Sequence, residues 1–225
     1  MRTSLIAVLL FQVLALFMRA YLRLGLQENG LDQEFANDLS YLIVPPVLAI
    51  LMLPIIRANL DLLRDALDLR RINIRLVFTA IAIGLLARLI WWLQLVARVL
   101  LGLTPDSDPG DIAAPVFTFH CPQPQAMLVA LLVFGCLIPI VEEVINRGLI
   151  QSWLTPRGTW FAILISATLF AVFHAPGAIP AAFVGGLVFG VQFARTKTLW
   201  APIITHASYD VLIVFDWRCL NGVWV

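Results

Sequence analysis

The sequence predicts an all-α membrane protein: a polytopic bundle of about seven transmembrane helices plus one amphipathic surface helix. Hydrophobic residues make up 61% of the 225 residues and charged residues only 13%, about half the share that soluble domains carry. The mean hydropathy is +0.92. Long apolar runs recur, and about 20 apolar residues suffice to cross a bilayer as a helix. No polar stretch is long enough for a second domain, so one membrane domain is expected.

Charge and cysteine content argue against several other classes. The formal net charge is +1, which gives no case for a nucleic-acid partner. The three cysteines, Cys121, Cys136 and Cys219, form no Cys-x-x-Cys pair. Neither a zinc ribbon nor a disulfide framework is therefore indicated. A single bridge between Cys121 and Cys219 stays open, because both are expected on the same side of the membrane.

The first apolar run, residues 4–18, is predicted to be a transmembrane span. A signal peptide is the alternative, but no small-x-small cleavage site follows the run. Arginines also flank both of its ends, with Arg2 before it and Arg19 and Arg23 after it. A polar and acidic stretch, residues 24–40, then leads to the second span.

The second span is expected at about residues 41–56, where Pro45 and Pro46 should break or kink the helix. Residues 57–71 differ, because their leucines fall on one helical face and their charges elsewhere. This pattern predicts an amphipathic helix on the membrane surface. Five arginines between residues 57 and 75 place this loop in the cytoplasm by the positive-inside rule.

The third span is predicted at about residues 76–96. Trp91 and Trp92 suit the belt of aromatic residues at the outer membrane interface. Arg88 lies close to that belt, so it is interpreted as an interfacial arginine that snorkels rather than a buried functional one. The acidic loop at 104–125 contains no lysine or arginine, which places it outside.

Four more spans are predicted, at about 127–153, up to 174, 180–193 and 199–215. Short basic loops at 155–158 and 195–197 are expected in the cytoplasm. The alternation puts the amino terminus inside and the carboxyl terminus outside. A Gly-x-x-x-Gly at 186–190 in the sixth span lets another helix backbone approach closely.

The fourth span carries Glu142, Glu143 and Arg147 where the bilayer would otherwise be the solvent. A charge at that depth costs a few kcal/mol or more, so it is rare without a partner or a use. On a helix Glu143 and Arg147 share one face and can pair, while Glu142 points about 100° away. One carboxylate can thus be held by the arginine while the other faces something else. The pair alone could also be a structural lock between helices.

Two further pairs lie at membrane depth, Phe170 with His174 and His206 with Asp210, each at four-residue spacing. Counted from the turns, Glu142 and His174 differ in depth by only a few ångströms, and the last pair lies one or two turns shallower. Helix tilt can absorb that difference. Alone, His174 could cap a helix end, and the last pair could clamp two helices. Together, these groups are typical of a hydrolytic site.

The three motifs, with their order and gaps, resemble those of the CPBP intramembrane proteases, the CAAX-protease and bacteriocin-processing family also called Abi. They are Glu142-Glu-x-x-x-Arg147, Phe170-x-x-x-His174 and His206-x-x-x-Asp210. The glycine-rich connector before the last motif is similar too. The resemblance covers about residues 126–215, and the first 125 residues match nothing that we can name. The family's last motif usually ends in Asn, whereas here it ends in Asp.

The resemblance implies an endopeptidase that cuts a membrane-associated protein or peptide near its carboxyl terminus. Glu142 would be the general base that activates water, with His174 assisting. His206 and Asp210 would help to hold the scissile carbonyl and its oxyanion. Since an anionic carboxylate beside an oxyanion is repulsive, we predict that Asp210 is protonated or orients His206 instead.

The resemblance also implies that Arg147 pairs with Glu143 and fixes its helix. The family was long described as metal-dependent, and one Glu, two His and a water could hold zinc. Against this, the chain has no His-Glu-x-x-His, and the arginine competes for the carboxylates. A metal-free glutamate mechanism is therefore favoured, with the zinc-dependent version as the alternative.

The expected organisation is an N-terminal part, 1–125, with transmembrane helices and the surface helix, and a part at 126–218 that carries the site. One rival is a non-catalytic immunity or scaffold protein of the same fold, which would be expected to lose Glu142 or His174. Another is a transporter or proton relay, for which inverted repeats would be expected. The features fit a prokaryotic inner membrane, with a membrane protein or peptide as substrate.

Overall fold

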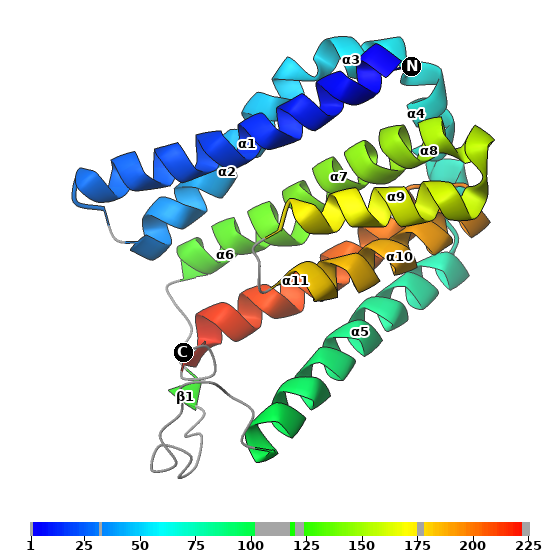
Figure 1. Ribbon diagram of the computed structural model, residues 1–225. Coiled ribbons are helices and arrows are strands. Elements are labelled where there is room, and N and C mark those ends of the chain that lie inside the picture. Colours follow the sequence, from blue (N-terminus) through cyan, green and yellow to red (C-terminus); the bar gives the residue numbers. More distant parts are fainter. Residues whose placement is uncertain (1, 32, 102–117, 120–123, 175–177, 222–225) are drawn as a thin grey trace.

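The computed structural model describes residues 2–31, 33–101, 118–119, 124–174 and 178–221, and helices make up nearly all of them (Figure 1). The N-terminal part contains α1 (Arg2–Glu28), α2 (Gln33–Leu51), α3 (Leu53–Ala58), α4 (Leu60–Ala66), the 3₁₀ turn η1 (Leu69–Arg71) and α5 (Ile74–Leu100). The all-α membrane bundle predicted from the sequence is confirmed.

A nearly continuous helix then spans residues 124–154. It consists of α6 (Pro124–Leu132), the π-helix η2 (Val133–Leu137), α7 (Ile138–Glu143), the π-helix η3 (Val144–Gln151) and α8 (Ser152–Leu154). The chain continues through the 3₁₀ turn η4 (Thr155–Arg157), α9 (Thr159–Val172), α10 (Ile179–Thr196) and α11 (Trp200–Cys219). Two short strands, β1 (Thr118–Phe119) and β2 (Leu220–Asn221), pair antiparallel.

The helices are arranged around the segment 124–154. In Figure 1 the α1–α2 pair lies on one side of α6 and α7, and α5 lies on the opposite side of the bundle. α1 packs along α2, α9 along α10, and α5 along α11. The site therefore has α1 and α2 as an outer wall on one side.

Each predicted span overlaps a helix, but the boundaries of the first two spans are wrong. The polar stretch 24–40 is largely helical, since α1 extends to Glu28 and α2 begins at Gln33. Pro45 and Pro46 lie inside α2 without breaking it. The helix is interrupted instead at Met52, and a new helix, α3, begins after it. Pro54 lies in the first turn of α3, where the N–H that proline lacks would have no hydrogen-bond partner within the helix.

The predicted single surface helix at 57–71 is also wrong, because Asn59 divides it. The Asn59 Nδ2 donates to the carbonyl of Ile55 at 2.8 Å, and its Oδ1 accepts from the Trp153 indole at 3.0 Å. Such side-chain bonds compete with helix continuation. Of the expected apolar face, Leu63 is buried against the bundle, whereas Leu60 is exposed. This segment therefore packs on the bundle as well as covering its end.

Two of the loops predicted to be basic and cytoplasmic, 57–75 and 195–197, meet at one end of the bundle. Arg71 donates to the carbonyl of Lys197 at 2.8 Å, and the Thr198 hydroxyl and Leu199 N–H donate to that of Ala66 at 3.1 and 2.8 Å. The Trp200 indole donates to Leu67 at 3.0 Å. A shared end is what the predicted alternation of spans requires. The face of the membrane that this end occupies stays a prediction.

Arg88 does not snorkel to an interface as expected, because its side chain is only 3% exposed. Its guanidinium carbon lies 4.2 Å from the centre of the Trp91 ring and 5.6 Å from that of Tyr209. The reason is the close approach of α5 to α11, which covers this turn of α5. The pattern of apolar residues within α5 alone could not predict that α11 covers Arg88.

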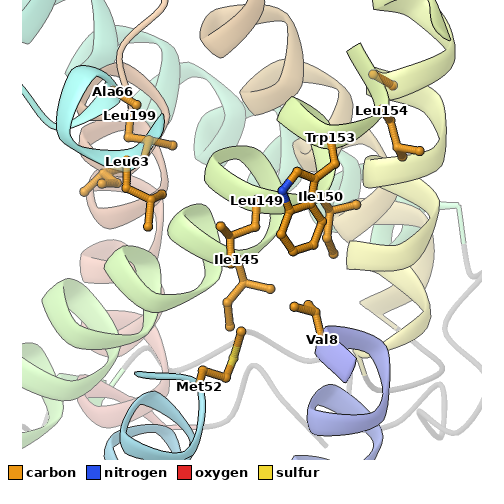
Figure 2. Packing of buried hydrophobic residues seen from close by; sticks show 12 residues of the cluster. Val8, Met52, Leu63, Ala66, Ile145, Leu149, Ile150, Trp153, Leu154 and Leu199 are labelled. Atoms are coloured by element: carbon orange, nitrogen blue, oxygen red, sulfur yellow. The ribbon is translucent and has the colours of Figure 1, made fainter. Parts of the chain in front are cut away.

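The largest core cluster lies where the segment 144–154 meets five other parts of the chain. Val8 of α1 and Met52 approach Ile145 and Trp153 (Figure 2). Val8 is fully buried, so the first predicted span forms part of the folded bundle. The same cluster includes Leu63, Ala66, Leu149, Ile150, Leu154, Ala162, Leu199 and Ile203.

The outer surface of the bundle is apolar, as a lipid-facing surface must be. Large hydrophobic side chains such as Phe17, Phe78 and Trp160 are exposed. Among the described residues three helices are long and apolar enough to cross a membrane: Ile6–Glu28, Ile74–Gln94 and Ile179–Thr196. The chain is a membrane protein. Most of the acidic loop predicted at 104–125 falls outside the described residues, as does Cys121 of the possible Cys121–Cys219 bridge. Part of the sequence before the predicted domain boundary at residue 125 also lies outside them.

Candidate active site

The expected ion pair between Glu143 and Arg147 forms at the centre of the bundle. Arg147 Nη1 donates to Glu143 Oε1 at 3.1 Å, and both side chains are fully buried. Arg147 Nη2 also donates to the carbonyl of Gly186 in α10, at 3.1 Å. A buried ion pair needs such additional hydrogen bonds to offset its desolvation. The arginine thus ties the helix 124–154 to α10.

Two aromatic rings enclose this arginine. The Arg147 guanidinium carbon lies 4.6 Å from the centre of the Phe170 ring and 5.2 Å from that of Phe189. Rings in these positions attract a cation through their quadrupoles. Phe189 also stacks on His206, with ring centres 4.8 Å apart and planes 20° apart. The two phenylalanines therefore hold both the cation and the imidazole in place.

His206 of α11 is surrounded by three carboxylates. Its Nδ1 lies 3.0 Å from Glu143 Oε1, and its Nε2 lies 3.3 Å from Asp210 Oδ2 and 3.9 Å from Glu142 Oε2. The single intramembrane cluster that turn counting predicted is therefore present. An imidazole with a carboxylate at each ring nitrogen has a fixed orientation.

A π-helix begins directly after Glu143. The α-helical α7 ends at Glu143, and η3 carries Arg147 and Gln151 on buried positions. Gln151 Nε2 donates to the carbonyl of Gly190 at 2.9 Å, which repeats one turn later the contact of Arg147 with Gly186. π-helical turns are rare and often lie at functional sites. Here the irregular turn presents two side chains to successive glycine carbonyls of α10.

His174 follows the end of α9 and has the capping role that the sequence left open. Its Nδ1 lies 2.8 Å from the carbonyl of Phe170, which has only an acceptor to offer. This contact places the proton on Nδ1 and leaves Nε2 as the acceptor nitrogen. The Phe170 and His174 rings lie 4.6 Å apart. Capping thus also orients the imidazole.

Glu142 and His174 line one cavity of about 100 Å³ between the α1–α2 pair and the core. The Glu142 side chain is 33% exposed, in contrast to its buried neighbour Glu143. The two glutamates therefore have different surroundings, as the helical geometry predicted. Asn146 lines the same cavity and donates from Nδ2 to the carbonyl of Glu142 at 2.8 Å.

Comparison with known proteins gives the family of this part of the chain. Residues 124–212 match the family described as Type II CAAX prenyl endopeptidase Rce1-like. This match supports the resemblance to the CPBP family seen in the sequence, and residues 124–212 are called the CPBP segment below. Over 92 residues, the chain is 33% identical to the Bacillus subtilis (strain 168) protein named "Putative membrane peptidase YdiL". That match covers 40% of this chain and 38% of the relative. No solved structure shows a significant match.

The CPBP segment contains all six predicted site residues, and its bounds agree with the resemblance seen in the sequence. Sequence reasoning missed Phe189 and Asn146, which surround the cluster from α10 and η3. Phe189 lies inside the Gly-x-x-x-Gly motif at 186–190. That motif, which indicates close helix packing, was the signal in the sequence that could have pointed to Phe189. Residues of α1 that line the cavity, outside the CPBP segment, were missed because no motif marks them.

In their present arrangement, the side chains do not form the ligand set of one Glu and two His that the zinc alternative requires. Among the described residues no group of three or more His, Cys, Asp or Glu side chains could hold a metal ion. Glu143 Oε1 already accepts from Arg147 and lies against His206. These contacts engage Glu143 with Arg147 and His206 rather than leaving it open as a metal ligand.

Proposed function

We propose that the chain is an intramembrane endopeptidase that hydrolyses a peptide bond of a membrane-associated protein or peptide, near the substrate's carboxyl terminus. One observation carries the proposal: Glu142 and His174 face one cavity at membrane depth, while Glu143 and Arg147 behind them form a buried ion pair. If the Glu143–Arg147 pair served only to hold helices together, there would be no need for a second carboxylate, Glu142, beside His174 in a cavity.

In this proposal Glu142 is the general base. It takes a proton from a water in the cavity, the water oxygen bonds to the scissile carbonyl carbon, and the carbonyl oxygen becomes an oxyanion. Glu142 then passes the proton to the leaving nitrogen as the C–N bond breaks. His174 lines the same cavity, and in this proposal its acceptor nitrogen Nε2 assists in orienting the water.

In this scheme His206 shares its Nε2–H between Asp210 and the developing oxyanion, and Asp210 is a positioning residue that acts through His206. The 3.3 Å contact between Asp210 Oδ2 and His206 Nε2 supports the second of the two predicted roles for Asp210, orientation of His206. Glu143 holds the opposite ring nitrogen at 3.0 Å. Preorganised donors of this kind give the largest share of catalysis in many enzymes.

The proposed mechanism uses no metal and no other cofactor. The proposed setting is a prokaryotic inner membrane with the amino terminus in the cytoplasm, and the partners are the bilayer and a membrane-embedded substrate rather than nucleic acid. The basic loops gathered at one end of the bundle support this orientation.

The test compares the wild type with Glu142→Ala, both purified in detergent, on a panel of fluorogenic peptides with and without a strong chelator. Cleavage that is lost in the variant and unaffected by the chelator is expected. Loss on chelation and restoration by zinc would replace the glutamate mechanism with the metal-dependent one. Equal activity in both proteins would remove Glu142 as the base.

A further inference from the structure

Asn146 contributes a buried amide to the wall of the cavity that Glu142 and His174 share. It is only 2% exposed and lines that cavity. Its Nδ2 donates to the carbonyl of Glu142 at 2.8 Å. Because a carbonyl only accepts, the NH₂ group must face it, and Oδ1 is therefore the other end of the amide. Ser166 of α9 donates to the backbone carbonyl of Asn146 at 2.9 Å, so the residue is held in place from two sides.

The side-chain oxygen of Asn146 has no donor within the protein. Oδ1 is buried and has no hydrogen-bond partner among the described residues. Leaving a buried acceptor unsatisfied is unfavourable, and asparagine is also a poorer helix former than leucine. A leucine at this position would therefore suit an apolar helix better. The amide indicates a ligand that donates a hydrogen bond to it.

A second unpartnered amide oxygen lies in the wall that α1 contributes to the same cavity. Gln12 lines the cavity, and its Oε1 is buried without a hydrogen-bond partner in the part of the chain that the structure describes. Val8 lies one turn earlier on the same helical face and is fully buried in the core, so this face of α1 is directed toward the bundle. The cavity wall thus contains two acceptors, one from η3 and one from α1.

The chemistry of the cavity selects the kind of ligand. The two unpartnered atoms are acceptors, so they match an N–H donor and not the oxygens of a phosphate or carboxylate. Arg19 also lines the cavity, which disfavours a cation there. Most of the wall is apolar, with side chains such as Phe11, Val44 and Ile145. A peptide backbone outside a regular helix exposes N–H groups that find no bulk water at membrane depth, and neutral acceptors in an apolar wall fit such a backbone.

We propose that Asn146 Oδ1 and Gln12 Oε1 accept hydrogen bonds from two backbone N–H groups of the substrate and hold a non-helical stretch of its chain beside Glu142. The inference rests on the proposed function, because the bound peptide is the one being cut. Backbone recognition does not depend on side chains, so the substrate class is an unwound apolar segment rather than one particular sequence. Proline, which has no N–H, is disfavoured at both bound positions.

The test uses Glu142→Ala, which lacks the proposed base, in detergent. Alanine is chosen over glutamine because a second side-chain amide near Asn146 could itself donate to Oδ1. Affinity is measured by fluorescence anisotropy for a fluorescein-labelled apolar decapeptide and for analogues in which one backbone amide at a time is replaced by an ester. The ester keeps the carbonyl and the side chain but removes the N–H. Two of the esters should bind roughly three- to thirtyfold more weakly than the parent peptide.

Asn146→Leu, added to the same protein, should abolish the loss at one of these positions, and Gln12→Leu the loss at the other. Gln94→Leu, at an exposed glutamine of α5, is the matched control and should keep both losses. The ratio of parent to ester affinity is the readout, because a variant that only loosens the structure weakens both alike. The unfolding midpoint of each variant reports folding. If Asn146→Leu does not fold, Asn146→Ala replaces it with the same expected result.

Equal affinity for the parent peptide and all its esters, including no measurable binding of any, would overturn the subsite. So would an ester loss that persists at both positions in either variant. A lower kcat for Asn146→Leu in the active protein, with no ester loss at any position, would assign Oδ1 to the attacking water and overturn it as well. Ester losses that depend on Asn146 and Gln12, without cleavage by the wild type, would keep the subsite and reject the protease, so the two failures are distinguishable.

Discussion

The Nδ1 atom of His206 lies 3.0 Å from Oε1 of Glu143, the same oxygen that accepts from Arg147 at 3.1 Å. One carboxylate oxygen thus joins the helix 124–154 to α11 and, through the arginine, to α10. Its neighbour Glu142 faces the cavity. The two adjacent glutamates are therefore expected to respond differently to the same substitution.

Glu143→Gln is expected to destabilise the protein, because Arg147 would remain buried without its counter-ion. Loss of one partner of a buried pair typically costs about 3–5 kcal/mol. Glu142→Gln should leave stability within about 1 kcal/mol of the wild type, since its side chain is partly exposed, but reduce peptide cleavage at least about a hundredfold. Thermal unfolding in detergent and a cleavage assay measure both effects. Equal unfolding midpoints for the two variants would contradict the structural role of Glu143.

Asp210→Asn is expected to retain most of the activity, because the amide oxygen still accepts from His206 Nε2. Asp210→Ala removes that acceptor and should lower kcat roughly a hundredfold with little change in KM, as misorientation of a reacting group does. Steady-state kinetics on both variants provide the test. If the Asn variant is as impaired as the Ala variant, the negative charge itself is required.

Gly186→Ala is expected to separate α10 from α9 and weaken the contact of Arg147 with the Gly186 carbonyl. An added Cβ would lie 2.9 Å from Ala167 Cα and 3.0 Å from its Cβ. Overpacking of this kind costs about 1–3 kcal/mol. Gly185→Ala is the control, because its Cβ would meet only Phe189, at 3.6 Å. Thermal unfolding should rank the control above Gly186→Ala, and the reverse order would refute the close-packing interpretation.

Gly84→Ala tests whether α5, which lies outside the CPBP segment, must pack tightly on α11. An added Cβ would lie 2.6 Å from the Thr205 carbonyl oxygen and 2.9 Å from Ser208 Cβ. The variant should unfold at a lower temperature than the wild type. Gly25→Ala meets nothing within 4 Å and should be neutral or slightly stabilising, because alanine favours the helix. A Gly84 variant as stable as the Gly25 variant would show that α5 packs loosely.

The sequence was sufficient to predict the fold class and the convergence of the site, because both follow from local rules. Four-residue spacing paired Glu143 with Arg147, and counting from the turns brought Glu142 and His174 to a similar depth, with His206 within one or two turns of it. The burial of Arg88 and the break at Asn59 were not predictable in that way. Both depend on contacts with residues distant in sequence, Tyr209 and Trp153 respectively.

The same limit applies to η3 and to α1. A π-helical turn leaves no signature in apolar periodicity, and in η3 it accompanies the contacts of Arg147 and Gln151 with the glycine carbonyls of α10. The inward face of α1 is likewise set by its packing beside α2 and the core. In the sequence, Arg19 and Arg23 resembled charges that flank a transmembrane span. Only the packing of α1 shows that they line cavities.

The buried Glu143–Arg147 pair also constrains how the protein is made. Its helix emerges from the ribosome before α10 and α11, which supply the Gly186 carbonyl and His206. Exposed to lipid alone, that helix would hold an ion pair without its further partners, an unfavourable state. Stable integration of this helix into the bilayer is therefore coupled to the synthesis of the last two helices, and truncation before α10 should yield a chain that membrane quality control removes.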